Sequence, residues 1–571
     1  MSAPESSLGS PGSALRLVDL LLEEQQSLSA VERFSQRHEV DDLPLQARYY
    51  RDLIPSDRPG VGQQLAFRVD LDRCTGCKAC VTACHSLNGL DPGETWRDIG
   101  GLVGEVAGLA YQQTVPSACH HCEDPGCLAG CPVQAYAKDP ETGIVRHLDD
   151  QCIGCQYCVL KCPYDVPKYN PARGIVRKCD LCSGRLAVGE APACVQGCPN
   201  QAISIEIVDT AVPRVERLLP VEAGAMPSSR ITRPTTRYVG SRSGLGRVRP
   251  ADTRLAPRVE AHTPLVLMMI SIQLSVGLLG VDFVSGLLAP GSASSLRPVW
   301  AVLAAAVGIA GQAGAFLHLG RPLYAFRAFL GWRTSWMSRE ILVLGPFAGL
   351  VAAYAASLWL GPLFLESGSP VAWVPILQRG LCAGALVVGA LATFCSVMIY
   401  ADTHRPFWSL GRSSFRFFGS VVVLGSAGSL FCATDAALFG ARVPEALVDG
   451  LGMLGVAAIL AKLCAELSDL RCRGDLTASA LERSARLMRG ALRRELQLRI
   501  ATAVAGLSLL LLLLALPRGA GPVIAGLASA SFALLLIGEL LERHLFFRAE
   551  AAPAMPGMVG TGFEGTDGGW T

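Results

Sequence analysis

Sixteen of the 21 cysteines lie between Cys74 and Cys198, and they fall into four groups of four. The groups are Cys74, Cys77, Cys80 and Cys84; Cys119, Cys122, Cys127 and Cys131; Cys152, Cys155, Cys158 and Cys162; and Cys179, Cys182, Cys194 and Cys198. Three closely spaced thiolates surround part of one cubane cluster, and the fourth, beyond a further turn, ligates the other cluster of a pair. The spacing therefore predicts two pairs of clusters, or four [4Fe–4S] clusters in all.

Structural zinc and disulfides are the alternatives for so many cysteines. Zinc sites usually show two short Cys-x-x-Cys pairs separated by a longer gap, a pattern that only the fourth group has. The first residues, MSAPESSLGSPGSALRLVDLLLEEQQ, contain no twin arginine and no apolar core with a cleavage site, so we expect no secretory signal. A domain that is not exported stays reduced, which disfavours disulfides.

The segments between the cysteines must position them. Four short β-prone runs alternate with the cysteine groups: LAFRVDLDR, GIVRHLDD, GIVRKCD and AISIEIVD. This alternation predicts small strand-and-loop modules wrapped around metal over residues 65–208.

Three further segments carry no assigned chemistry. Residues 1–60 are expected to form an N-terminal helical extension, with a capping box between Ser29 and Glu32. Residues 209–262 are rich in Arg and Pro and predict a linker or a strap. Residues 549–571 predict a disordered tail.

Residues 263–548 change to long apolar runs, as expected for a chain that is 50% hydrophobic and only 17% charged. Each run is near the ~20 residues that a bilayer requires, and none has the polar stripe of a soluble helix. The expected spans are 264–288, 298–319, 340–361, 379–400, 416–434, 446–467, 499–517 and 522–541. We therefore expect an all-α membrane domain of eight helices in a lipid bilayer. The net charge of +2 gives no reason to expect nucleic acid.

The cysteine-containing half resembles the four-cluster iron–sulfur subunit of dimethyl-sulfoxide-reductase-type molybdoenzymes. The stretches that carry the resemblance are VDLDRCTGCKACVTACHSLNG, SACHHCEDPGCLAGCPVQAY, LDDQCIGCQYCVLKCPYDVPKY and RKCDLCSGRLAVGEAPACVQGCPNQAI. The apolar half resembles the eight-span membrane anchor of the same enzymes, in HLGRPLYAFRAFLGWRTSWMSREI, MIYADTHRPFW and GELLERHLFF. The chain is thus identified as a fusion of two subunits that are usually separate.

This resemblance implies an α+β ferredoxin-like domain with two pairs of clusters, followed by the helical anchor. It also implies the ligand sets. These are Cys74, Cys77, Cys80 and Cys198; Cys84, Cys179, Cys182 and Cys194; Cys119, Cys122, Cys127 and Cys162; and Cys131, Cys152, Cys155 and Cys158. Some relatives replace one ligand of the third quartet by an aromatic residue and carry a three-iron cluster. Because Cys155 is present here, four cubanes are expected.

A quinol is the expected partner of a membrane-bound cluster chain, as menaquinol or ubiquinol from the quinone pool. Its site needs an apolar cleft with a few polar groups that accept protons. His318, Arg321 and Glu340 lie at the ends of the second and third spans and are the best candidates. The alternative is that these side chains only anchor the helix ends in the interface. Weaker candidates are Asp282, Asp435, Lys462, Glu466 and Glu539.

The histidines of this half indicate whether haem is bound, and the arginines indicate how the chain is oriented in the membrane. The four histidines of this half, His262, His318, His404 and His544, lie at or beyond the ends of the expected spans, so we expect no haem. Arginines gather before the first span and after spans two, four and six, whereas the alternate loops have only Arg297, Arg442 and Arg518. Basic loops face the cytoplasm. We expect a multi-pass protein of the plasma (inner) membrane with its iron–sulfur domain on the cytoplasmic face.

No pterin site is recognisable, so the chain alone is not expected to reduce a terminal acceptor. We expect an electron-transfer and anchor subunit that oxidises quinol and passes electrons through four clusters to a separate molybdopterin catalytic subunit. That subunit would reduce an S- or N-oxide, nitrate or a sulfur compound. The alternatives are flow from a dehydrogenase to quinone, and a redox sensor or scaffold with structural clusters. A proton pump is disfavoured because no dense run of Lys and Glu crosses successive spans.

Overall fold

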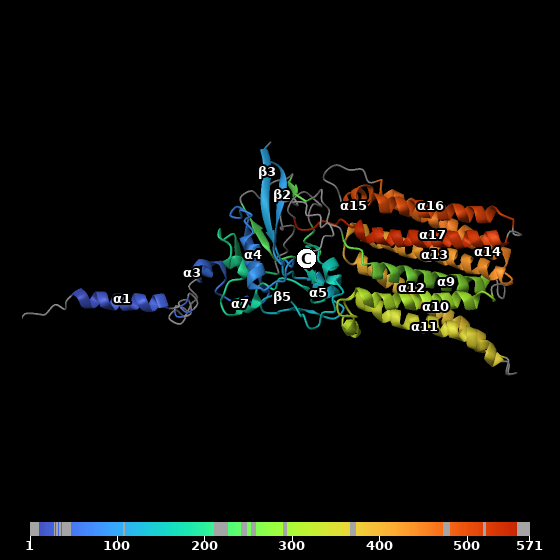
Figure 1. Ribbon diagram of the computed structural model, residues 1–571, viewed down its shortest axis with the longest axis horizontal. Coiled ribbons are helices and arrows are strands. Elements are labelled where there is room, and N and C mark those ends of the chain that lie inside the picture. The colour runs from blue at the N-terminus through green and yellow to red at the C-terminus, as the bar shows by residue number, and fades with distance from the viewer. Residues whose placement is uncertain are drawn as a thin grey trace, which may run out of the picture.

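The computed structural model has two parts: a strand-and-loop part and a bundle of long helices. The strand-and-loop part lies at one end of the bundle (Figure 1). It describes residues 11–27, 29, 32, 36, 47–106, 109–210, 227–240, 248–252, 259–288, 294–365, 373–471, 480–517 and 521–556. The expected fold class, an α+β ferredoxin-like part followed by eight membrane helices, is confirmed.

The N-terminal extension is helical where it is described. Helix α1 (Pro11–Ser27) stands apart from the body of the molecule (Figure 1), and α3 (Ala47–Tyr50) leads into a short 3-10 turn, η1 (Arg51–Leu53). The predicted capping box is confirmed, since the Ser29 amide donates to Glu32 Oε2 at 2.8 Å and the Glu32 amide donates to Ser29 Oγ at 3.2 Å.

The ends of the cysteine-rich segment close on each other through one sheet with the order β8-β1-β9. Strand β1 (Gln63–Asp70) pairs antiparallel with β8 (Ile203–Asp209) and parallel with β9 (Arg237–Val239). Val69 near the end of β1 faces Ile203 at the start of β8 in this register. Cys74 follows β1 and Cys198 precedes β8, so both cysteines lie at the same end of the sheet.

Smaller sheets and helices hold the other cysteines. A long hairpin, β2 (Asp98–Val106) and β3 (Leu109–Ser117), is extended by β10 (Val248–Pro250). Two short hairpins separate the cysteine groups: β4 (Tyr136–Lys138) with β5 (Val145–His147), and β6 (Lys168–Asn170) with β7 (Ile175–Arg177). Short helices begin within or beside the groups: α4 (Ala79–Leu87), α5 (Gly126–Gly130), α6 (Tyr157–Lys161), α7 (Ser183–Ala187) and α8 (Ala193–Gln196).

Part of the segment expected to be a linker or a strap is built into the iron–sulfur part. Of residues 209–262, the described stretch 227–240 supplies β9, and Thr235 Oγ1 donates to the carbonyl of His120 at 2.7 Å. The structure does not describe residues 211–226, 241–247 and 253–258.

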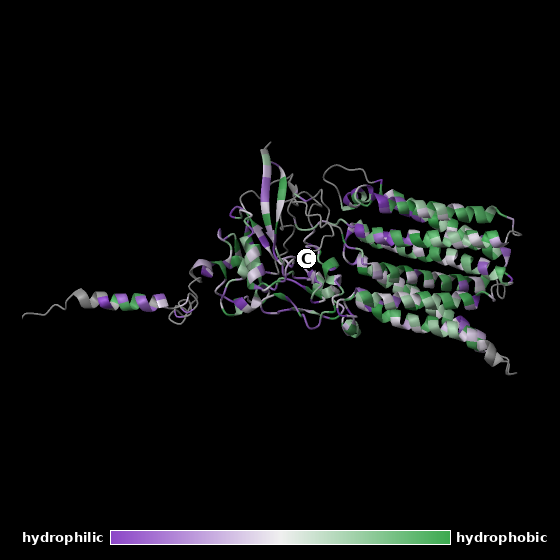
Figure 2. Ribbon diagram, viewed as in Figure 1, coloured by the Kyte–Doolittle hydropathy of each residue, from purple (hydrophilic) through white to green (hydrophobic). Residues whose placement is uncertain are grey.

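Within the described residues, eight helices are long and apolar enough to cross a membrane, and in Figure 2 hydrophobic residues colour much of their length green. They are α9 (Thr263–Leu288), α10 (Arg297–Ala315) with its 3-10 extension η2 (Phe316–His318), α11 (Trp336–Leu365), α12 (Trp373–Ala401), α13 (Leu410–Leu438), α14 (Glu445–Asp469), α16 (Arg493–Ala515) and α17 (Gly521–Arg548). Three short elements join them: η3 (Pro322–Phe329), η4 (Pro406–Trp408) and α15 (Ala480–Arg489). Several expected spans were too short, because charged residues near the helix ends are paired inside the bundle instead of ending the helices.

Helix α9 is central, and it packs against α10, α12, α13 and α17. Its Gly277 meets Gly425 of α13 so closely that a Cβ on Gly277 would lie 2.3 Å from the carbonyl oxygen of Val421. Small residues permit this approach between helix backbones in a membrane.

The predicted disordered tail is wrong for residues 549–556. After α17 ends, Ala549 and Ala551 are buried, and Met555 packs into the core of the iron–sulfur part with Tyr50 and Ile203. These apolar side chains fill space between the two halves, which explains their order. Residues 557–571 lie outside the described chain.

Candidate functional site

The structure brings together cysteines that lie far apart in the sequence. Cys80 has Cys194, Cys198 and Cys74 as neighbouring thiols, and Cys84 has Cys194 and Cys182. Cys122 lies beside Cys119, Cys127 and Cys162, and Cys158 lies beside Cys131, Cys152 and Cys155. We name the ligand sets that the family resemblance implies group I (Cys74, Cys77, Cys80, Cys198), group II (Cys84, Cys179, Cys182, Cys194), group III (Cys119, Cys122, Cys127, Cys162) and group IV (Cys131, Cys152, Cys155, Cys158). As complete ligand sets they stay a prediction.

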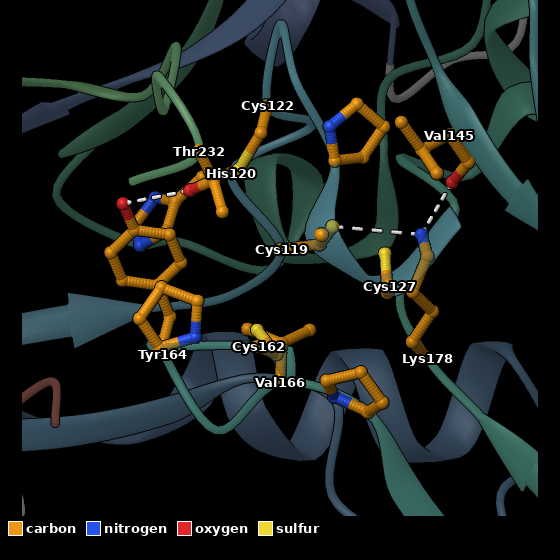
Figure 3. A pocket seen from close by; sticks show the side chains of 14 residues that line it. Cys119, His120, Cys122, Cys127, Val145, Cys162, Tyr164, Val166, Lys178 and Thr232 are labelled. Carbon is orange, nitrogen blue, oxygen red and sulfur yellow. Dashed lines mark hydrogen bonds between the residues drawn. The ribbon is translucent and has the colours of Figure 1, made fainter. Parts of the chain in front are cut away.

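The cysteines of group III line a pocket, which Figure 3 shows from close by together with His120, Tyr164 and Lys178. Burial raises the pKa of Cys122 well above its usual value, so four thiolates held here need cationic charge beside them. Lys178 supplies one charge, because its Nζ lies 3.5 Å from Cys119 Sγ and also donates to the Val145 carbonyl (Figure 3). Four thiols around one pocket, with a cation beside them, are the soft ligand set that suits an iron–sulfur cluster.

Arg97 is a second buried cation, and it lies beside the thiols of groups I and II. Burial alone would lower the pKa of Arg97, but the thiols of Cys194, Cys80 and Cys179 hold it above its usual value. Arg97 therefore lies between groups I and II. Backbone amides also face the sulfurs, since Ala135 N donates to Cys131 Sγ at 3.1 Å. Such donors and charges tune cluster potentials.

The four groups form a series. Cys119 of group III is among the thiols that lie around Cys179 of group II. Tyr136 stands between groups III and IV, with Cys127 and Cys158 as neighbours. The order is therefore I–II–III–IV, with the solvent-exposed Cys77 at one end.

Group IV lies against the membrane helices. Cys155 packs against the hydrophobic core of the bundle, and Leu319 packs among the residues around group IV. The backbones approach so closely that a Cβ on Gly174 would lie 2.6 Å from the carbonyl oxygen of Gly320. The Arg321 amide donates to the Ile153 carbonyl at 3.0 Å. The last group of the series is thus seated on the helix ends.

The structure separates the roles of the three expected quinol residues. The His318 ring is half-buried, and its Nε2 has no hydrogen-bond partner among the described residues. Arg321 contacts the iron–sulfur part, because its Nη1 donates to the Asp149 carbonyl at 2.9 Å. Glu340 is buried and accepts a hydrogen bond from Ser396 Oγ. Among the described residues, no hydrogen bond joins His318, Arg321 and Glu340 to one another. Their side chains bond to Ala315, Asp149 and Ser396, respectively.

Tyr157 was missed by sequence reasoning. This fully buried side chain belongs to the iron–sulfur part, yet its hydroxyl donates to the Ile399 carbonyl of α12 at 3.0 Å. Its charged neighbours include both Cys155 and Glu340. Tyr157 therefore stands between group IV and the carboxyl of the expected quinol site. Its place between two cysteines, in CQYC, was the one signal that the sequence offered.

The weaker candidates lie elsewhere. Asp282 pairs with Arg297 at 3.0 Å near the far end of the bundle. Lys462, Glu466 and Glu539 belong to an ionic network between α13, α14, α16 and α17. Asp435 is half-buried on α13, with Cys432 as a neighbour.

Replacing Tyr157 with Phe removes the hydrogen bond to Ile399 and keeps the ring. A buried hydrogen bond contributes about 1 kcal/mol, so local opening of this interface should become about fivefold more frequent. Hydrogen exchange of residues 152–162, measured by mass spectrometry, should show faster exchange, whereas Tyr169→Phe on β6 should leave this segment unchanged. Unaltered protection in Tyr157→Phe would contradict the assignment.

Replacing Lys178 with Met removes the buried cation of group III. At an effective dielectric of about 20, a unit charge roughly 8 Å away contributes about 2 kcal/mol. One cluster potential should therefore become more negative by about 90 mV, as read from a redox titration followed by electron paramagnetic resonance (EPR). Lys168→Met is the control, since Lys168 is more exposed and pairs with Asp165. Identical titrations for Lys178→Met and the parent protein would show that Lys178 has no such influence.

Comparisons with known proteins agree with this arrangement. Residues 260–548 match the family model described as "DMSO reductase anchor subunit (DmsC)". Residues 110–207 match a 4Fe-4S dicluster domain, and residues 65–86 match a 4Fe-4S binding domain.

Several curated proteins are similar to the front half. The B subunit of anaerobic dimethyl sulfoxide reductase from Escherichia coli K12 is 41% identical over 154 residues, which cover 26% of this chain and 75% of that subunit. The probable anaerobic dimethyl sulfoxide reductase subunit YnfG of the same strain is 37% identical over 179 residues, which cover 30% of this chain and 86% of YnfG. The formate dehydrogenase-O iron–sulfur subunit, also from that strain, is 37% identical over 166 residues, which cover 25% of this chain and 52% of that subunit.

The anchor model covers about half of the chain, and three quarters of the dimethyl sulfoxide reductase B subunit align with its front half. Both parts of the sequence interpretation are thereby confirmed, including the fusion. The chain belongs to the dimethyl sulfoxide reductase anchor family, and it joins that anchor to an electron-transfer iron–sulfur subunit in one membrane protein.

Proposed function

We propose that the chain oxidises quinol at the helix ends beside group IV and carries electrons through four [4Fe–4S] clusters, IV to I, to a separate catalytic subunit. The sixteen cysteines of groups I–IV would ligate the clusters, which supply one-electron redox chemistry when bound. The observation that carries the proposal is the contact of Cys155 with the membrane core, close to Tyr157 and Glu340.

His318 and Glu340 would bind the quinol ring oxygens and accept its protons. A quinol gives up two electrons and two protons, so its site needs both a nearby electron acceptor and a proton acceptor. Glu340 is a buried carboxyl on the helix end next to group IV, and His318 Nε2 has no other partner in the described chain. Arg321 would act as a positioning residue through its bonds to Ile153 and Asp149.

Group I would pass electrons out of the chain. Cys77 is exposed, and a groove beside Cys74 is lined by Thr75, Gln112 and Thr114. We infer that a molybdopterin subunit docks over this end, as the similarity to the dimethyl sulfoxide reductase B subunit suggests. Flow in the opposite direction, towards quinone, is the second candidate, supported by the similarity to the formate dehydrogenase-O iron–sulfur subunit.

The test is quinol-driven cluster reduction in the anaerobically purified full chain, reconstituted in lipid. A naphthoquinol should bleach the cluster absorbance, and chemical analysis should give about sixteen irons per chain. Clusters that accept electrons from dithionite but neither give electrons to quinone nor take them from quinol would support a structural role and end this proposal.

The arginine distribution predicts the cytoplasmic orientation of the iron–sulfur part. Alkaline phosphatase fused after Arg518 should be active, because this loop lies on the opposite side of the membrane. A fusion within residues 471–494 should be inactive. The reverse pattern would place the clusters outside the cytoplasm.

A further inference from the structure

A line of polar groups leads away from Glu340 across the helix bundle. Ser396 of α12 donates to Glu340, and Tyr400 follows one helical turn later on the same face. Tyr400 is buried, and its hydroxyl points to Met269 Sδ of α9 at 4.0 Å. Glu340 is also the first charged neighbour of Tyr400. The line thus passes from α11 through α12 to the central helix.

The line continues from α9 to α17. Gln273 lies one turn after Met269, and its Oε1 accepts a hydrogen bond from Arg543 Nη2 at 3.3 Å. The same Nη2 lies 3.2 Å from Ser420 Oγ of α13. Arg543 is completely buried, with its guanidinium 3.8 Å above the ring of Phe417. This arginine therefore connects the two halves of the bundle.

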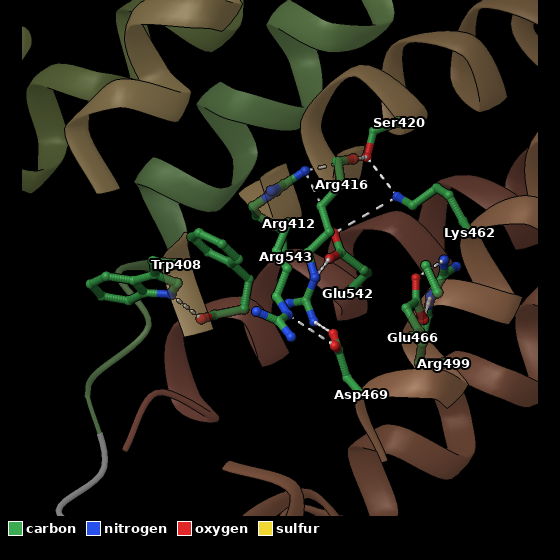
Figure 4. A network of polar contacts seen from close by, with 12 residues as sticks. Trp408, Arg412, Arg416, Ser420, Lys462, Glu466, Asp469, Arg499, Glu542 and Arg543 are labelled. Atoms are coloured by element: carbon green, nitrogen blue, oxygen red, sulfur yellow. Dashed lines mark hydrogen bonds and ion pairs between the residues drawn. The ribbon is translucent and has the colours of Figure 1, made fainter. Parts of the chain in front are cut away.

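Beyond Arg543 lies the ionic network of Figure 4. Glu542 is 3% exposed and lies 3.5 Å from Arg543, 3.8 Å from Arg416 and 3.9 Å from Lys462. Lys462 also pairs with Glu539. Among the described residues, neither carboxylate oxygen of Glu542 has a hydrogen-bond partner, and neither do Nε and Nη1 of Arg543. Buried charged groups left in this way require water, so the site is expected to be hydrated.

A groove between α13 and α14 gives this site access to solvent. Arg412, Arg416, Lys462, Glu466 and Asp469 line it. Arg412 and Asp469 lie at the helix ends that face the iron–sulfur part, whereas Lys462 lies about 10 Å deeper, at ~1.5 Å per residue. Lys462 is therefore both the floor of the groove and a partner of Glu539 and Glu542.

We propose that this line is a proton route, in which Tyr400, Glu542 and water along the polar side chain of Gln273 carry protons between Glu340 and the α13–α14 groove. It rests on the proposed function. Quinol oxidation yields quinone, two electrons and two protons. The clusters that the cysteines of groups I–IV would hold would accept the electrons, and the protons leave through water beside Glu542. Arg543, Arg416, Lys462 and Glu539 face Glu542 and balance its charge. The carboxylate oxygens of Glu542 and the Nε and Nη1 atoms of Arg543 lack hydrogen-bond partners in the described chain, so they offer acceptors and donors to water along this route.

The experiment follows cluster reduction and proton release together after a naphthoquinol is mixed with the full chain in lipid nanodiscs. Glu542→Gln should slow both events by about 100-fold, near the lower end of what one proton-transfer group contributes. Tyr400→Phe keeps the aromatic packing and should also slow them, which guards against a folding defect in Glu542→Gln. Added formate, a small weak acid, should restore much of the rate in Glu542→Gln. Reduction by dithionite should remain normal in all variants.

Asp282→Asn is the matched control, because Asp282 is a buried membrane carboxylate away from the line. Wild-type proton release in both Glu542→Gln and Tyr400→Phe would overturn the route while leaving quinol oxidation intact. Slow release that formate does not restore would also overturn it, since it would show a general disturbance. If quinol fails to reduce the parent protein at all, the proposed function fails first.

Discussion

A protein in which Cys155 and Cys158 are both replaced by Ser should lose quinol-driven reduction of every remaining cluster. These thiols belong to group IV, the only group of the described chain seen to pack on the membrane core. The iron content should fall from about sixteen to about twelve per chain. Dithionite should still reduce the clusters of groups I, II and III, because their ligands are unchanged. EPR spectra after quinol and after dithionite separate the two cases.

The control for this change is Cys464→Ser, which removes an exposed thiol outside the four groups. It should keep the full iron content and the full rate of quinol-driven reduction. If the Cys155→Ser, Cys158→Ser protein were still reduced by quinol at the parent rate, electrons would enter elsewhere. The order IV to I would then be wrong.

The cysteine modules were largely predictable from the sequence. The four β-prone runs lie on β1, β5, β7 and β8, because alternating residues such as Ile203 and Ile205 face the core. The hairpin of β2 and β3 was not foreseen. Its first strand, DIGGLVGEV, carries three glycines and little alternation, so it gave no strand signal.

Contacts between distant segments were not predictable in the same way. Tyr157 and Ile399 are 242 positions apart, and no local pattern links them. Arg416, Arg499 and Arg543 looked like span ends because hydropathy alone treats a charge as a boundary. In the structure their partners come from other helices, so each helix extends beyond the charge that seemed to end it.

Replacing Glu340 with Gln should lower the rate of quinol-driven cluster reduction by about 100-fold or more, since a positioned proton acceptor contributes at least that much. Gln keeps the size of the side chain and a hydrogen-bond acceptor for Ser396, so packing on α12 should be retained. Glu340→Asp, which keeps the carboxyl, should recover part of the rate. Stopped-flow absorbance at saturating quinol gives the effect on the electron-transfer step apart from binding.

Glu445→Gln provides the matched control, because Glu445 is exposed at the opposite end of the bundle, on the first residue of α14. It should behave as the parent protein. His318→Ala should act differently from Glu340→Gln, mainly by weakening quinol binding, because the ring is only half-buried at the end of η2. A normal rate in Glu340→Gln together with a lost rate in His318→Ala would move the proton acceptor to His318. The buried carboxyl beside Tyr157 would then be a structural partner of Ser396 only.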